Sequence, residues 1–155
     1  MPERLVIPTG AVTLEAIAAG AGGRPLLLVH GFGGAKEDFA DHLDALAAAG
    51  WHAVAPDLRG HGRSDHPPGT ENYSLAIFAA DMIDAAGVLG WDRFTLLGHS
   101  MGGMVAQLMA IDAGHRLDGL ILMDTAHAAP DGLDPETVEL ARAVVAEGGM
   151  QLLVR

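Results

Sequence analysis

The chain contains no cysteine and few basic residues, and these two shortages narrow what it can do. Without cysteine there is no disulfide, no thiolate-bound zinc and no thiol nucleophile. Its 20 aspartates and glutamates against 9 lysines and arginines give a formal net charge of -11 at pH 7. Nucleic acid and anionic membranes would repel such a chain, so we expect neither as a partner.

Long apolar runs and an export signal are also missing. The most apolar stretch, residues 94–111, is interrupted by glycine, histidine, serine and glutamine, which argues against a membrane span. Residues 1–10 mix acidic and basic groups and contain no apolar segment followed by a small-residue cleavage site. We therefore expect a cytoplasmic protein.

Short apolar runs alternate with helical patterns along the chain, as expected of an α/β protein. The first two runs flank a turn at residues 8–10 and predict a β-hairpin. The run at residues 25–29 is continuously apolar, as in a parallel sheet covered on both faces. We predict an α/β fold with a mostly parallel sheet flanked by helices on both faces. The predicted strands are residues 5–7, 12–17, 25–29, 52–55, 94–97 and 120–123, and the predicted helices are residues 39–49, 75–89, 104–113 and 133–146.

Residues 94–103 contain the most informative motif, Gly-x-Ser-x-Gly, between an apolar run and a helical pattern. Strand, sharp turn and helix form the context in which this motif presents a serine to substrate. Gly98 and Gly102 remove side chains that would collide in the turn. We expect Ser100 to be the nucleophile, with the Met101 amide donating to a developing oxyanion. A serine that only caps the helix is the simpler alternative.

A second glycine-rich loop, His30-Gly31-Phe32-Gly33-Gly34, follows the apolar run at residues 25–29. Such a loop between strand and helix can also bind phosphate. The dinucleotide fingerprint would need glycine or alanine at Lys36, and the Gly-x-x-x-x-Gly-Lys-Ser/Thr pattern is absent from the sequence. Nucleotide binding is therefore disfavoured.

A third loop, residues 57–65, is rich in polar side chains. Asp57, His61, Asp65 and His66 include oxygen and imidazole groups that could bind a divalent metal. Their spacing matches no compact metal motif, so we expect no metal site and a structural role for the loop.

Two helices are predicted to differ in how they are buried. In the helix at residues 75–89, Asp81 and Asp84 are expected on the solvent face, opposite an apolar stripe that begins at Leu75. The helix that follows Ser100 is apolar on nearly all sides, up to Ile111, and is expected to lie buried under the sheet.

Taken together, residues 30–34, 57–65 and 98–103 resemble the α/β-hydrolase superfamily in order and spacing, and the resemblance covers about residues 5–124. It implies that the Phe32 amide is the second oxyanion donor beside Met101 and that residue 30 braces the loop. It implies a serine hydrolase of ester-type acyl bonds, carboxylesterase-like or lipase-like, acting on a small molecule without a cofactor. Thioesters, lactones and carbon–carbon bonds remain open.

The same resemblance shows what the chain lacks. Family members place the triad acid and histidine after the seventh and eighth strands, whereas this chain ends near the sixth. A serine nucleophile also disfavours the epoxide-hydrolase and haloalkane-dehalogenase branches. We interpret residues 1–127 as the amino-terminal part of the hydrolase core and residues 128–155 as the start of a lid. We therefore expect little or no catalysis by this chain alone, and a non-catalytic binding or assembly module on the same fold is the alternative.

Three histidines are candidates for the general base. His115 would lie roughly 20 Å from Ser100 at 1.5 Å per helical residue. His99 adjoins Ser100, but neighbouring side chains on that turn are expected to diverge. Asp124 and His127 follow the strand at residues 120–123, and we interpret them as a strand end and the start of the lid.

The strand at residues 120–123 is apolar and is expected at a sheet edge. Exposed apolar edges recruit further strands. We therefore expect the polypeptide to self-associate, to pair with a second half, or to be poorly soluble.

Overall fold

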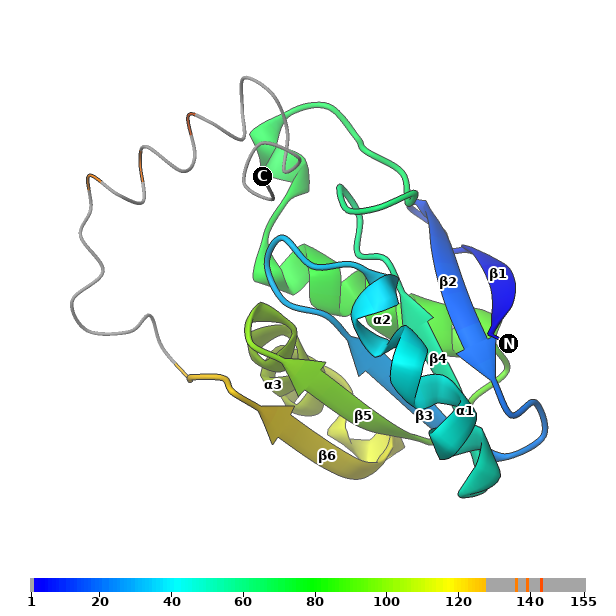
Figure 1. The fold of residues 1–155 in the computed structure, drawn as a ribbon. Coiled ribbons are helices and arrows are strands. Elements are labelled where there is room, and N and C mark those ends of the chain that lie inside the picture. Colours follow the sequence, from blue (N-terminus) through cyan, green and yellow to red (C-terminus); the bar gives the residue numbers. More distant parts are fainter. Residues whose placement is uncertain (1, 128–135, 137–138, 140–142, 144–155) are drawn as a thin grey trace. The chain divides into compact units, whose positions relative to one another are not determined.

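The computed structural model describes residues 2–127, 136, 139 and 143 (Figure 1). Met1–Thr125 form one compact unit and Ala126–Arg155 another, and every strand and helix described below belongs to the first. The lid predicted at residues 128–155, including its helix at residues 133–146, lies outside the described residues except at three positions.

The centre of the first unit is a six-stranded sheet with the order β1-β2-β4-β3-β5-β6. β1 and β2 form the predicted hairpin, and β2 also pairs with β4 in antiparallel fashion. β4, β3, β5 and β6 are parallel, which confirms the mostly parallel sheet. The strands are β1 Glu3–Pro8, β2 Thr13–Ala19, β3 Arg24–Val29, β4 Trp51–Pro56, β5 Phe94–His99 and β6 Leu117–Met123.

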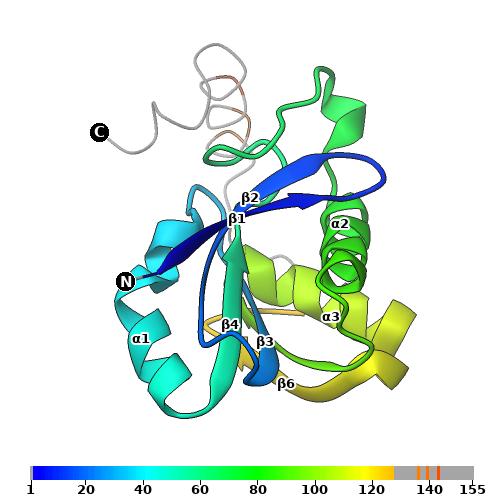
Figure 2. The ribbon, with the colours of Figure 1, turned by 90° about the vertical axis from the view of Figure 1, so that its right-hand side faces the viewer.

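Helices cover both faces of this sheet, as predicted. Figure 2 shows α1 on one face and α2 and α3 on the other. The Ser74 side chain caps α2 by accepting a hydrogen bond from the Ile77 amide at 3.1 Å. The helices are α1 Ala40–Ala48, α2 Leu75–Val88 and α3 Met101–Ala113, with short 3₁₀ turns at Lys36–Phe39, Thr70–Asn72 and Gly114–Arg116.

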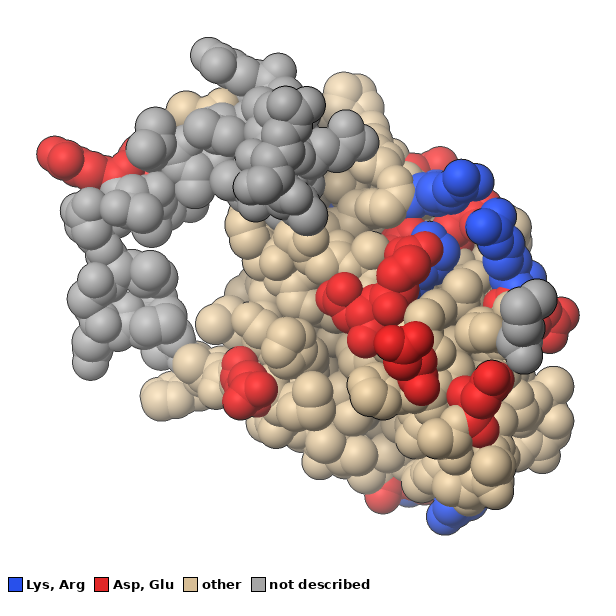
Figure 3. Space-filling model, viewed as in Figure 1, with Lys and Arg blue, Asp and Glu red and all other residues tan. Residues whose placement is uncertain are grey.

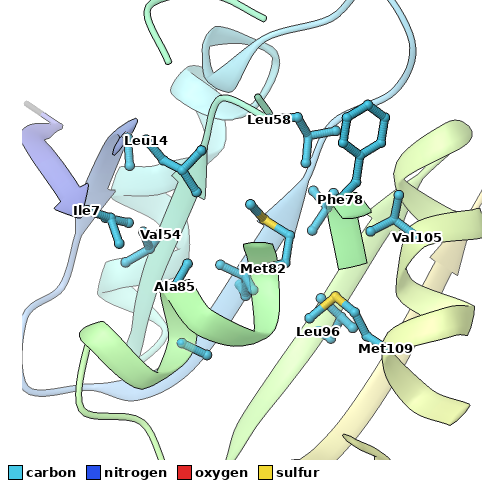
Figure 4. Packing of buried hydrophobic residues seen from close by; sticks show 14 of the residues in the cluster. Ile7, Leu14, Val54, Leu58, Phe78, Met82, Ala85, Leu96, Val105 and Met109 are labelled. Atoms are coloured by element: carbon cyan, nitrogen blue, oxygen red, sulfur yellow. The ribbon is translucent and has the colours of Figure 1, made fainter. Parts of the chain in front are cut away.

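The hydrophobic core consists of two clusters, one on each face of the sheet. In β3, Leu27 and Val29 join the cluster under α2 and α3, whereas Leu26 and Leu28 join the smaller cluster under α1. Because alternate strand residues point to opposite faces, a strand buried on both sides is continuously apolar. Figure 4 shows the larger cluster, where Met82 of α2 packs among strand and helix side chains.

Two predictions about the helices are wrong. Asp81 is only 2% exposed, because it follows Phe78 by three residues and precedes Ala85 by four, which places it on the buried side of α2. Its carboxylate is paired with Arg59 rather than with solvent. Ile111 is 77% exposed, because α3 packs through its other side, including Val105.

Candidate active site

Ser100 lies at the junction between β5 and α3. Its backbone angles are φ 52° and ψ −119°, a left-handed conformation that side chains disfavour. Such backbone strain costs about 1–3 kcal/mol and persists where the surroundings enforce it. Although Ser100 occupies the N-cap position, its side chain makes no capping hydrogen bond. Ser100 is half-buried, and its hydroxyl is therefore not used to stabilise the helix.

Three neighbouring segments hold the Ser100 backbone. Its amide donates to the Met123 carbonyl of β6 at 3.0 Å. Its carbonyl accepts from the Gly103 amide of α3 at 2.9 Å and from Thr125 Oγ1 at 2.7 Å. Strand, helix and the following loop thus fix the strained residue in one orientation.

Close backbone packing explains the glycines on either side of Ser100. A Cβ atom added to Gly98 would collide with the Gly102 carbonyl oxygen, and one added to Gly102 would collide with the carbonyl oxygen of Val29. The turn can therefore form only without side chains at these positions. Met101 is the first residue of α3, and the first amides of a helix have no partner within it.

The loop at residues 30–34 lies beside Ser100. Val29 of β3 is paired with Gly98 of the parallel strand β5, so both strands end at the same edge of the sheet. A Cβ atom on Gly31 would lie 3.1 Å from the Cβ of Ser100, which shows how closely the two segments approach. The next residue, Phe32, is 59% exposed. The residues predicted to donate to an oxyanion thus follow two neighbouring strands, Phe32 after β3 and Met101 after β5, at the edge of the sheet where Ser100 lies.

His30, at the start of this loop, is completely buried. Its Nε2 lies 3.0 Å from the Leu58 amide, and its Nδ1 lies 2.8 Å from the Gly31 carbonyl oxygen. Burial lowers its pKa, and His61 acts in the same direction, against the opposing effects of the Gly31 hydrogen bond and of nearby carboxylates. The structure therefore holds His30 neutral between the two loops.

Hydrogen bonds from other protein groups hold the loop at residues 57–65 in place. Asp57 accepts hydrogen bonds from Lys36 Nζ at 2.6 Å, from the Lys36 amide at 2.8 Å and from the Arg63 amide at 3.0 Å. Burial opposes the charge on Lys36, but the hydrogen bonds to Asp57 and Glu37 outweigh it and raise the Lys36 pKa. Asp65 accepts from the Thr13 amide at 2.7 Å. Two of the four candidate metal ligands, Asp57 and Asp65, are thus committed to protein groups.

His61 packs 5.0 Å from His30, ring centroid to ring centroid. It is 8% exposed, and its Nε2 has no hydrogen-bond partner among the described residues. Burial lowers the pKa of His61 as well. No group of three or more acidic or histidine side chains in the described part of the chain could hold a metal ion.

Among the described residues, no histidine is hydrogen-bonded to Ser100. His115 lies beyond the carboxyl end of α3, in the turn Gly114–Arg116. His99 and Ser100 both lie against Gly31, but no hydrogen bond joins them within the described residues. Asp124 directly follows β6, is exposed and has a φ of 45°. His127 belongs to the second unit.

Sequence reasoning missed several residues that shape this site. The Lys36 side chain is 5% exposed, because its ammonium group reaches Asp57 across 21 positions of sequence. Arg59 and Asp81 form a second buried pair, Nε to Oδ2 at 2.6 Å, which raises the pKa of Arg59 mainly through the hydrogen bonds to Asp81. Of these residues, only the burial of Asp81 could have been predicted from the sequence, because Asp81 follows Phe78 by three positions, which is helical spacing.

An apolar groove of about 390 Å³ lies on the α1 face of the sheet. Figure 3 shows that the surface over β5 and β6 carries few charged groups, whereas acidic groups gather over α1. Residues 120–123 of β6 are 40–45% exposed, and Met123 belongs both to this strand and to the groove. The groove is lined by Leu28, Phe39, His42, Ala45, Leu46, Leu97 and Met123.

Similar proteins were found by sequence and by structure. Epoxide hydrolase A of Mycobacterium tuberculosis (strain ATCC 25618 / H37Rv) is 34% identical over 105 residues, which cover 67% of this chain and 33% of that protein. The serine hydrolase-like protein of Danio rerio is 36% identical over 103 residues, 66% of this chain and 31% of that protein. The solved thioesterase domain from the curacin biosynthetic pathway has a TM-score of 0.77 and 27% identity, covering 92% of this chain and 52% of that one.

The chain thus spans about a third of the length of these two curated relatives. In its described part, no helix is both long and apolar enough to cross a membrane. A family model described as alpha/beta hydrolase fold matches residues 24–147, which include the Ser100 junction and both preceding loops. The chain belongs to the alpha/beta hydrolase fold family.

Proposed function

We propose that this chain supplies the nucleophile and the oxyanion donors of a serine hydrolase that acts on ester-type acyl bonds of small molecules. Ser100 is the nucleophile, and the backbone amides of Phe32 and Met101 are the donors. The observation that carries the proposal is the strained, part-exposed Ser100, whose hydroxyl has no capping role although it stands at a helix N-terminus. Strain of this kind persists where a fold must present one side chain in one direction.

The chemistry follows from these groups. Ser100 Oγ attacks the carbonyl carbon, a base accepts its proton, and the carbonyl oxygen becomes an oxyanion between the two amides. The alcohol leaves with a proton, and water then releases the acid from the acyl-serine. Loss of one oxyanion donor costs about 3–4 kcal/mol of activation free energy, so both amides are needed.

The relatives do not all share one named reaction, so the bond type needs a separate argument. A serine that opened an epoxide or displaced a halide would form an ether, which water does not readily cleave. A serine that attacks a carbonyl forms an ester, which water does cleave, so the cycle can close. Ser100 therefore favours acyl substrates, such as esters and thioesters.

The general base is proposed to come from polypeptide beyond the described residues. The chain spans 52% of the similar thioesterase domain. In addition, residues 120–123 of β6 are exposed, and an apolar groove lies beside this strand. In this proposal one further segment covers the sheet edge and carries the acid and the histidine. In its absence we expect the exposed edge to promote self-association. A lid at residues 128–155 and a cytoplasmic location remain predictions.

A fluorophosphonate probe tests the nucleophile without needing a full triad. Ser100 Oγ would displace fluoride from phosphorus, and added imidazole would take up the serine proton. We expect labelling at Ser100 with a rate that rises with imidazole concentration, measured by mass spectrometry of peptides. Ser100→Ala should abolish labelling, whereas Ser74→Ala, which removes a capping serine, should leave the rate unchanged.

The second candidate function is a non-catalytic binding or assembly module. It is favoured by one observation, that no histidine in the described residues is hydrogen-bonded to Ser100. If no labelling occurred even with imidazole while the protein remained folded, the nucleophile proposal would be wrong and the binding module would replace it.

A further inference from the structure

The hydrogen bonds of His30 determine which of its nitrogens carries the proton. The Leu58 amide is a donor, so Nε2, at 3.0 Å, must accept with its lone pair. A neutral imidazole then carries its hydrogen on Nδ1, which lies 2.8 Å from the Gly31 carbonyl oxygen. Nδ1 therefore donates to Gly31, and only the neutral Nδ1–H tautomer satisfies both contacts.

The Gly31 carbonyl belongs to the same planar peptide group as the Phe32 amide. In a trans peptide the C=O and N–H bonds point in opposite directions, so fixing the oxygen also fixes the direction of the N–H. Two donors hold this oxygen, His30 Nδ1 at 2.8 Å and the Gly34 amide at 3.1 Å. The Phe32 N–H consequently points away from the buried histidine.

We propose that neutral His30 is a positioning residue that orients the Phe32 amide toward the oxyanion through the carbonyl of the same peptide. This inference rests on the proposed role of Phe32 in acyl transfer. The loop at residues 57–65 then has an indirect role in the site, because the Leu58 amide selects the His30 tautomer that donates to Gly31. The buried Leu58 thus acts on the site through His30.

Protonation of His30 would remove this arrangement. A hydrogen on Nε2 would face the Leu58 N–H, leaving two donors opposed and one hydrogen bond lost. The ionisable groups that influence His30 are His61, Asp57 and Asp38, and Asp57 is itself paired with Lys36. The buried setting favours the neutral form, and so does the ring of His61, whose centroid lies 5.0 Å away at an interplanar angle of 58°.

Nitrogen NMR of the histidine-labelled wild-type chain tests the tautomer directly. At neutral pH we expect a protonated Nδ1 and an unprotonated Nε2 at two buried histidines, His30 and His61, because Nδ1 of His61 lies 3.1 Å from the Arg59 carbonyl oxygen. The His30 signals are identified as those lost in His30→Asn. An Nε2–H tautomer, a charged ring or averaged nitrogen signals at His30 would overturn the inference. This measurement needs no catalytic activity.

The positioning role is tested by imidazole-dependent phosphonylation of Ser100. His30→Leu removes the donor to Gly31, whereas His30→Asn retains a side-chain N–H at nearly the same place. We expect the labelling rate to fall by about 100-fold in His30→Leu, as for loss of an oxyanion donor, and by less than about tenfold in His30→Asn. The Phe32 amide proton should shift downfield in the wild-type adduct but not in the His30→Leu adduct.

The outcomes separate this inference from the proposed function. Equal labelling rates in wild type and His30→Leu, with the same Phe32 shift, would overturn the role of His30 and leave Ser100 as nucleophile. No labelling of the wild type at any imidazole concentration would overturn both. If His30→Leu did not fold, the tautomer measurement and the His30→Asn rate would still decide the question.

Discussion

The two edges of the sheet differ in how they meet solvent. β1 carries Glu3 and Arg4 at its start and ends at Pro8, and charges and proline are the devices that keep an edge strand from pairing with another chain. β6 instead exposes Leu120 to Met123 in sequence, each 40–45% accessible. The first edge is protected against association, whereas the second offers an apolar strand for pairing. The two edge strands of the described sheet therefore differ in how readily each can pair with another chain.

The same contrast separates two Arg–Asp pairs of equal length. Arg59 and Asp81 lie 2.6 Å apart, Nε to Oδ2, with side chains 7% and 2% exposed. Arg93 and Asp118, on the β6 side, also lie 2.6 Å apart, Nε to Oδ1, but are 56% and 50% exposed. Distance alone therefore says little about how much each pair contributes to the free energy of unfolding, because water screens the charges of the second pair.

Removing one acid from each pair should show the largest difference. Asp81→Ala leaves Arg59 charged and buried, so we expect a loss of about 3–5 kcal/mol in the free energy of unfolding. Asp118→Ala, the matched control, should cost about 0–1 kcal/mol. Urea denaturation followed by circular dichroism measures both. Equal losses would contradict the distinction between the buried and the exposed ion pair.

A lysine on each edge strand tests association. We expect the wild-type chain to self-associate through β6, and Ile121→Lys to weaken association by at least about tenfold, since roughly 1.5 kcal/mol of apolar burial is lost. Val6→Lys, on β1 at a position 61% exposed, should leave the association unchanged. Light scattering at several concentrations measures this. A wild-type chain that stays a monodisperse monomer would show that the β6 edge is not a pairing surface.

Ser100→Gly tests whether the nucleophile position stores strain. Glycine adopts a φ of 52° without penalty, but it also raises the entropy of the unfolded chain. We expect a net gain of about 1 kcal/mol in stability together with loss of fluorophosphonate labelling. Ser74→Ala, which removes a real helix cap, should instead cost about 1 kcal/mol. A less stable glycine variant would argue against strain at Ser100.

Acidification is the gentlest perturbation, and it acts on two buried histidines, His30 and His61. The pKa values of His30 and His61 are lowered in the folded chain, so below about pH 6.5 the unfolded chain binds more protons than the folded one. Stability from these groups is present above that pH and is lost as the pH falls through their folded pKa values. We expect a shallower decline in His30→Asn, measured by urea denaturation between pH 7.5 and 5. An equal decline would mean that His30 does not contribute.

The local part of the candidate site could be predicted from the sequence. Gly98, Ser100 and Gly102 stand within five residues, and a strand followed by a helix leaves few conformations for such a turn. The hairpin and the continuously apolar β3 were equally readable, because their patterns reflect burial of nearby residues. Contacts between segments that are far apart in the sequence could not be predicted from such local patterns.

The misplaced Asp81 and the overlooked Lys36 illustrate that limit. Each is a charged side chain that sequence patterns assign to solvent, yet each is buried against a partner more than 20 positions away, Arg59 and Asp57 respectively. The hydrogen bonds of His30 to Leu58 and Gly31 belong to the same class. Burial of a charge depends on finding that partner, and a periodicity records only which face is apolar.

By itself, the sequence determined the α/β architecture, the serine turn and the apolar character of the sixth strand, because steric limits and hydrophobic periodicity act over a few residues. Only the tertiary structure decided the strain at Ser100, the approach of Gly31 to it and the tautomer of His30. Those depend on hydrogen bonds and ion pairs between β3, β5, β6 and the loop after β4, and such contacts exist only once the sheet has assembled.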